Sequence, residues 1–95
     1  MYKKYLEEAK NLFQAILSLE TVEECGAFFE DLCTIKEIED MSQRFEVARL
    51  LKEKKSYNEI SVLTGASTAT ISRVSRCLQY GVGYKTALAK TEGEE

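Results

Sequence analysis

The chain has 95 residues, of which 44% are hydrophobic and 31% are charged, and these proportions are typical of one small folded domain rather than of a disordered chain. It contains no histidine, which excludes His-based catalytic triads, histidine metal ligands and imidazole acid–base chemistry. The net charge of −3 conceals two opposed halves: residues 1–41 hold four lysines and ten acidic residues, whereas residues 42–90 hold nine basic and three acidic ones. The basic half favours a surface directed at a polyanion, although a merely solvated surface explains the bias equally well.

Helical periodicity begins at the N-terminus and continues along most of the chain. From Tyr2 to Leu17 the apolar residues follow the i, i+3, i+4 rule and predict an amphipathic helix. A capping-box signature, in which a hydroxyl and a carboxylate three residues apart satisfy each other's backbone amides, predicts further helix starts. It appears three times, at Thr21 and Glu24, at Thr34 and Glu37, and at Ser56 and Glu59. No segment alternates like a strand, so we expect an all-α fold.

The predicted helix after Thr21 is apolar over an unusually wide arc. Phe28 and Phe29 are adjacent and cannot share one narrow stripe, and residues 12–33 carry apolar side chains on more faces than a small monomer readily covers. A helix that is apolar all round must be buried. We therefore expect the N-terminal helices to build a dimer core, the alternative being a helix enclosed within its own monomer.

Residues 57–78 have the pattern of a helix-turn-helix. The Ser56 cap predicts a short helix that runs to about Thr64 and directs Ile60 and Leu63 inward. Gly65 stands where the chain must turn through a positive φ, and the small Ala66 lets two helices approach. Ser67 can cap a second helix, whose inward stripe is Ile71, Val74 and Leu78.

The outward positions of that second helix carry small side chains first and arginines later: they are Thr68, Ala69, Ser72, Arg73, Ser75 and Arg76. Small side chains let a helix enter the major groove, where hydroxyls bond base edges and methyl groups contact thymine. The arginines, the helix N-terminus and the nearby Lys52, Lys54 and Lys55 suit phosphates. The alternative for Arg73 and Arg76 is surface solubility alone.

After Leu78 the sequence predicts a C-cap at Gly81 and a last short helix over residues 84–89, with Tyr84 and Leu88 on the core. We expect one domain over residues 1–90 and a disordered acidic tail over residues 91–95. Cys25, Cys33 and Cys77 form no recognisable disulfide or zinc pattern and are expected to be buried free thiols. With no apolar run long enough for a membrane span or a signal peptide, we expect a cytoplasmic protein that has no membrane partner.

The stretch from Leu63 to Arg73, Leu-Thr-Gly-Ala-Ser-Thr-Ala-Thr-Ile-Ser-Arg, resembles the helix-turn-helix of the Trp repressor family. The likeness extends upstream through Leu32-Cys33-Thr34, Arg44 and Leu50-Leu51 and covers about residues 28–80. It is stronger still to the Trp repressor-like branch described as YerC/YecD-type. The resemblance implies an intertwined, all-helical homodimer that presents two recognition helices to a palindromic operator in double-stranded DNA.

The resemblance also implies functional positions. Those that match the family's DNA-facing residues are Asn58, Ser67, Thr68, Ala69, Thr70 and Ser72. From the residues themselves we predict that Thr68, Ala69 and Ser72 read bases, and that Asn58, Thr70, Arg73 and Arg76 contact phosphates or position the helix.

A second set, implied by the resemblance alone, matches the family's effector pocket: Thr34, Arg44, Arg73, Val74 and Cys77. Val74 and Cys77 stand where the tryptophan-responsive repressor has glycine and serine. A valine there would clash with an indole ring or fill its slot. The hypothesis is that L-tryptophan is not the co-repressor, and that either an unknown small molecule binds or the dimer needs none.

The sequence therefore predicts a DNA-binding transcriptional regulator, expected to be a repressor, without a cofactor or a metal. A protein-interaction module that retains the helix-turn-helix shape is the alternative, supported by the acidic total charge. Catalysis is not expected, because the neighbouring pairs Glu37 and Glu39, and Glu23 and Glu24, lie at helix starts, where capping and the helix dipole account for them.

Overall fold

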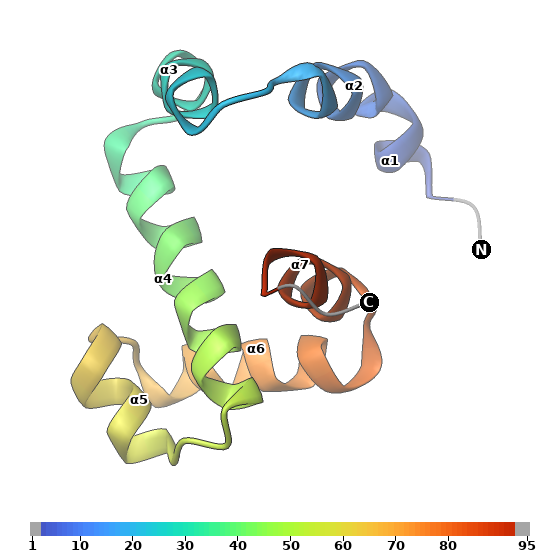
Figure 1. The fold of residues 1–95 in the computed structure, drawn as a ribbon. Coiled ribbons are helices and arrows are strands. Elements are labelled where there is room, and N and C mark those ends of the chain that lie inside the picture. The colour runs from blue at the N-terminus through green and yellow to red at the C-terminus, as the bar shows by residue number, and fades with distance from the viewer. Residues whose placement is uncertain (1–2, 93–95) are drawn as a thin grey trace. The chain divides into compact units, whose positions relative to one another are not determined.

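The computed structural model describes residues 3–92, and these residues form seven helices joined by short turns (Figure 1). In chain order the helices are α1 (Lys4–Glu8), α2 (Lys10–Ser18), α3 (Val22–Leu32), α4 (Ile35–Lys52), α5 (Tyr57–Thr64), α6 (Thr68–Tyr80) and α7 (Gly83–Thr91). No residue in this range lies in a strand, and the predicted all-α fold is confirmed. None of these helices is long and apolar enough to cross a membrane.

The chain divides into two compact units, residues 1–38 and residues 39–95. In the first unit, the single helix expected from Tyr2 to Leu17 is two helices, because Ala9 leaves the helical conformation between α1 and α2. Tyr2 itself lies outside the described residues. No side chain of α1, α2 or α3 is buried. The single domain over residues 1–90 stays a prediction.

All three predicted capping boxes lie at helix starts. The Thr21 hydroxyl accepts a hydrogen bond from the Glu24 amide at 3.0 Å, but the Glu24 carboxylate accepts from the Glu20 amide rather than from Thr21. The other two boxes are reciprocal, with distances of 2.8 and 3.1 Å between Thr34 and Glu37 and of 3.1 Å for both bonds between Ser56 and Glu59. Local side-chain chemistry therefore sets where α3, α4 and α5 begin.

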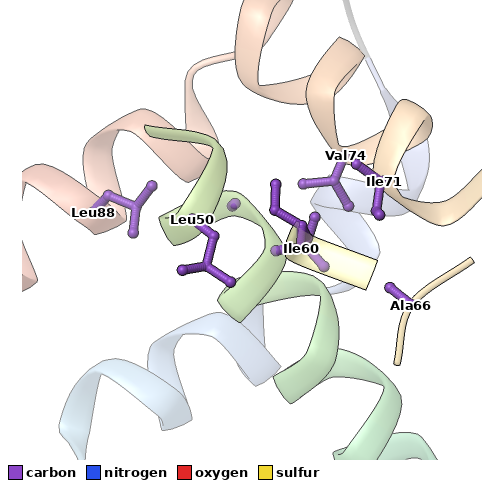
Figure 2. Packing of buried hydrophobic residues seen from close by; sticks show 8 residues of the cluster. Leu50, Ile60, Ala66, Ile71, Val74 and Leu88 are labelled. Carbon is purple, nitrogen blue, oxygen red and sulfur yellow. The ribbon is translucent and has the colours of Figure 1, made fainter. Parts of the chain in front are cut away.

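The buried core belongs to the second unit. In Figure 2 the side chains of Ile60, Ile71 and Val74 lie together, and each is at most 1% exposed. The full cluster consists of Val47, Ala48, Leu50, Ile60, Ala66, Ile71, Val74 and Leu88, with Leu51, Leu78 and Tyr84 packed against it. It joins α4 through α7, with α5 packed on α6 and α6 on α7. This cluster fixes α6 on its inner side and leaves the other side in solvent.

Two expectations about burial are wrong. Leu63 is 65% exposed. The inward side of α5 is formed instead by Ile60 and the half-buried Thr64, which are four residues apart. The cysteines are free thiols as predicted but none is buried: Cys25 and Cys33 are half-buried and Cys77 is exposed. Their helices explain this, since α3 buries nothing and Cys77 lies at the edge of the α6 stripe formed by Ile71 and Val74.

The C-terminal helix is longer than the sequence indicated. α7 carries the fully buried Leu88 and extends through Thr91, so the expected tail does not begin at residue 91. Glu92 is the C-cap of α7, and its amide donates to the Leu88 carbonyl at 2.9 Å. Residues 93–95 of the expected tail lie outside the described range. Gly81 is the C-cap of α6 as predicted, and a Cβ there would meet the Cys77 carbonyl oxygen at 2.8 Å.

Candidate nucleic-acid interface

The approach to α5 is a tight helix-ending turn. Lys54 has a φ of 68° and is the one non-glycine residue among residues 3–92 with a positive φ. Its amide donates to the Leu51 carbonyl at 3.0 Å, and the Lys55 amide donates to the Leu50 carbonyl at 3.1 Å. These two bonds form a Schellman motif, which satisfies the last carbonyls of α4. The turn places Lys54 and Lys55, both exposed, immediately before the Ser56 cap.

The turn between α5 and α6 depends on glycine and on four polar contacts. Gly65 has a φ of 76°, and its amide donates to the Ser61 carbonyl at 2.8 Å. The Thr64 hydroxyl accepts from the Ala66 amide at 3.1 Å, while the Ser61 hydroxyl donates to the Ala66 carbonyl at 3.0 Å. The Gln43 side chain donates to the Thr64 carbonyl at 3.1 Å and ties the turn to α4. The angle between α5 and α6 is therefore fixed by both backbone and side chains.

The second helix is oriented by its buried side. The Ser67 hydroxyl accepts from the Thr70 amide at 3.1 Å and starts α6, as the sequence predicted. Ile71 and Val74 are buried in the cluster shown in Figure 2. Because helical residues three and four apart lie on the same face, the side of α6 opposite Ile71 and Val74 presents a continuous surface. It consists of Thr68, Ala69, Ser72, Arg73 and Arg76, and all five are exposed.

The structure places the predicted DNA-binding residues on two neighbouring helices. Asn58 is exposed on the first turn of α5. Ser67 is exposed, but its hydroxyl is already engaged twice, as the α6 cap and as a donor to the Thr70 hydroxyl at 3.1 Å. Thr70 is half-buried, so it has less surface to offer than its neighbours. The DNA contacts of these residues stay a prediction.

Two basic residues of α4 are paired within the chain. Arg49 forms ion pairs with Glu46 and Glu53, and its hydrogen bonds to Glu46 hold the pKa of that carboxyl below its ordinary value. Lys52 forms an ion pair with Glu92 at 3.0 Å. The pKa of Glu59 is also lowered, because its carboxylate accepts a hydrogen bond from the Ser56 amide. The uneven sequence charge is thus partly compensated by carboxylates of the same unit.

The residues of the predicted effector pocket are differently placed. Thr34 belongs to the first unit and caps α4, where its hydroxyl accepts from the Glu37 amide. In the second unit Arg44 is half-buried, Arg73 is exposed and Val74 is buried in the core. Cys77 lines a hollow of about 460 Å³, whose other lining residues are Phe45, Gly81, Gly83, Tyr84 and Ala87. The use of these residues for an effector stays a prediction.

Sequence reasoning missed two residues that shape this surface. Gln43 ties the turn to α4 across 21 residues, and nothing local in the sequence indicates that contact. Lys54 has the left-handed backbone conformation that glycine usually adopts. The only sign of this in the sequence is the position of Lys54 between the last helical residue of α4 and the Ser56 cap.

Comparison with known proteins places this geometry in a family. The family model described as Trp repressor protein matches residues 7–92, well beyond the likeness read from the sequence. The uncharacterized protein YerC of Bacillus subtilis is 54% identical over 90 residues, which cover 94% of this chain and 86% of that protein. A crystal structure of a TrpR-like protein from Eubacterium eligens has a TM-score of 0.90 at 50% identity, and the match covers 98% of this chain and 99% of that one. A second solved structure, from Staphylococcus aureus, has a TM-score of 0.81 at 47% identity and covers 99% and 91%.

Proposed function

Because the chain belongs to the Trp repressor family of helix-turn-helix DNA-binding regulators, we propose that it is a transcriptional repressor that binds a palindromic operator as a homodimer. The observation that carries the proposal is the outer face of α6. Ile71 and Val74 hold the helix from the inside, while Thr68, Ala69 and Ser72 are exposed and small enough to approach base edges. Arg73 and Arg76 extend the same face toward phosphates.

The dimer is supported by the N-terminal unit. No side chain of α1, α2 or α3 is buried within the chain, yet these helices carry large apolar residues. Leu17 and Val22 are each 83% exposed. Apolar surface left in water costs about 25 cal/mol per Å², so a second copy that covers these helices stabilises both.

The test of DNA binding is a titration of a random duplex and of duplexes selected from genomic fragments. We expect salt-sensitive binding of the random duplex and selected sites that bind at least about 10³-fold more tightly. A protein that binds no duplex at low salt would contradict the proposal.

We also propose that L-tryptophan is not the effector. The support is Val74, which stands where the resemblance puts a glycine of the tryptophan-responsive repressor. Its side chain is enclosed in the core at 1% exposure, so the space that a glycine leaves free for a ring is filled in this chain. Isothermal titration with L-tryptophan should show no saturable heat at micromolar ligand. Saturable micromolar binding would refute this part of the proposal and leave DNA binding unaffected.

One observation favours the alternative of a protein-interaction module. Val62 and Leu63 on α5 are 84% and 65% exposed and, with Asn58 and Glu59, line a hollow of about 350 Å³. Exposed apolar surface of this kind occurs at protein contacts. The DNA titration separates the two functions, because a protein-interaction module has no salt-sensitive affinity for a random duplex.

A further inference from the structure

The basic corner that precedes the helix-turn-helix is formed by Lys52, Lys54 and Lys55, at the end of α4 and in the turn that follows it. All three are exposed, and they lie within four residues of the Ser56 cap of α5. Lysines next to a helix start that is presented to DNA are suited to contact phosphates. On the proposed function, this corner contributes to non-specific affinity for DNA.

A carboxylate of the same chain already contacts this corner. The Glu92 carboxylate lies 3.0 Å from the Lys52 ammonium, although the two residues are 40 positions apart in the sequence. Glu92 is also close enough to Arg49 to act on it electrostatically.

The core determines where Glu92 lies. Glu92 caps α7, and its amide donates to the carbonyl of Leu88, which is fully buried against the other helices of the second unit. Tyr84, on the same helix, also packs against the core. The contact between Glu92 and Lys52 is therefore built into the fold of this unit.

We propose that the Glu92 carboxylate acts as an internal competitor of DNA phosphate for the basic corner. A carboxylate and a phosphate oxygen make the same charge-assisted contact with lysine. A phosphate that approaches Lys52 must displace the Glu92 carboxylate, which also repels it. The competition lowers affinity for any duplex, and a selected operator overcomes it through its additional contacts to α6.

This inference rests on the proposed DNA-binding function and makes a distinct prediction about salt. A lysine that is already neutralised releases fewer DNA counterions when it binds a phosphate, so Lys52 adds less than a full contact to the salt dependence. Glu92→Gln should raise affinity for a random duplex about three-fold at low salt and steepen the slope of log K against log salt by up to about 0.9.

The control is Glu39→Gln, which removes the same charge from an exposed position near the start of α4. Glu39 lies 13 residues before Lys52 and outside the three helices proposed to form the dimer core. We expect this variant to leave the salt slope at its wild-type value. Urea unfolding of each variant checks that the substitutions leave the fold intact.

A double-mutant cycle assigns the effect to the ion pair. In a Lys52→Gln background, Glu92→Gln should leave the salt slope unchanged and raise affinity by less than two-fold. Equal slope changes in both backgrounds, or equal effects of Glu92→Gln and Glu39→Gln, would overturn the inference while DNA binding stands. If no variant binds any duplex, the proposed function fails, and the inference fails with it.

Discussion

Lys54 is the residue whose backbone departs most from what its side chain favours. A left-handed conformation costs an L-residue with a Cβ about 1 kcal/mol, and glycine adopts it without that cost. Lys54→Gly should therefore raise the free energy of unfolding by about 0.5–1 kcal/mol, measured by urea denaturation. Lys55→Gly is the matched control, because Lys55 follows in the chain without a positive φ. An equal gain from both variants would contradict the explanation.

The outer face of α6 should make two kinds of contact with DNA, to phosphates and to bases. Arg76→Ala removes a phosphate contact, so it should weaken binding to all duplexes and lower the salt slope by about one unit. Thr68→Ala removes a base contact and should relax base preference by about 1–3 kcal/mol. Titrations of selected and random duplexes over a range of salt measure both. If the two variants change specific and random binding alike, this division is wrong.

Sequence alone predicts side chains well where the signal is local. Ser56, Gly65 and Ser67 have the roles assigned to them, because a cap or a turn depends on residues within three positions. Burial is predicted less well. Leu63 is spaced from Ile60 as a core residue would be, but it lies on the exposed side of a short helix. The pairing of Lys52 with Glu92 is not predictable in this way, because it depends on where the core places α7.

At the scale of a helix, the start of α5 links folding to pH. The pKa of Glu59 is lower in the folded chain than its ordinary value of 4.5, because the ionised carboxylate accepts a hydrogen bond from the Ser56 amide. Its contribution to stability is present above the ordinary pKa and is lost as the pH falls through the folded-state pKa. The stability difference between wild type and Glu59→Gln should therefore shrink below about pH 4.5. Unfolding titrations from pH 7 to 3 measure it, and a difference that stays constant over that range would contradict the assignment.

Helix boundaries show where element prediction succeeds. The starts of α3, α4, α5 and α6 follow from hydroxyl caps that the sequence displays. The break at Ala9 and the extension of α7 to Thr91 carry no such signal, so one expected helix is two and another is longer than expected. Capping chemistry is local, whereas the end of α7 is set by its contact with the core through Leu88.

The whole molecule should exist as a dimer if the N-terminal helices form its core. We expect sedimentation equilibrium to give twice the chain mass of 10.8 kDa and a melting temperature that rises with protein concentration. Leu17→Asp should dissociate the dimer, because it places a charge on an apolar side chain that is 83% exposed in the single chain. Gln14→Asp adds the same charge at another exposed position of α2 and should leave the dimer intact. A wild-type protein of single-chain mass would refute the dimer.

The uncovered α1, α2 and α3 also bear on how substitutions at these positions should be judged. A replacement at Ile60 or Leu88 changes the stability of its own chain, because both side chains are buried in the core of that chain. A replacement at Leu17 or Val22 should not disturb the folding of the single chain, since water surrounds most of the side chain in a single copy. If substitutions at those two positions prove harmful, the cause is therefore a lost contact with a second molecule. Such substitutions would locate that contact even before the complex is isolated.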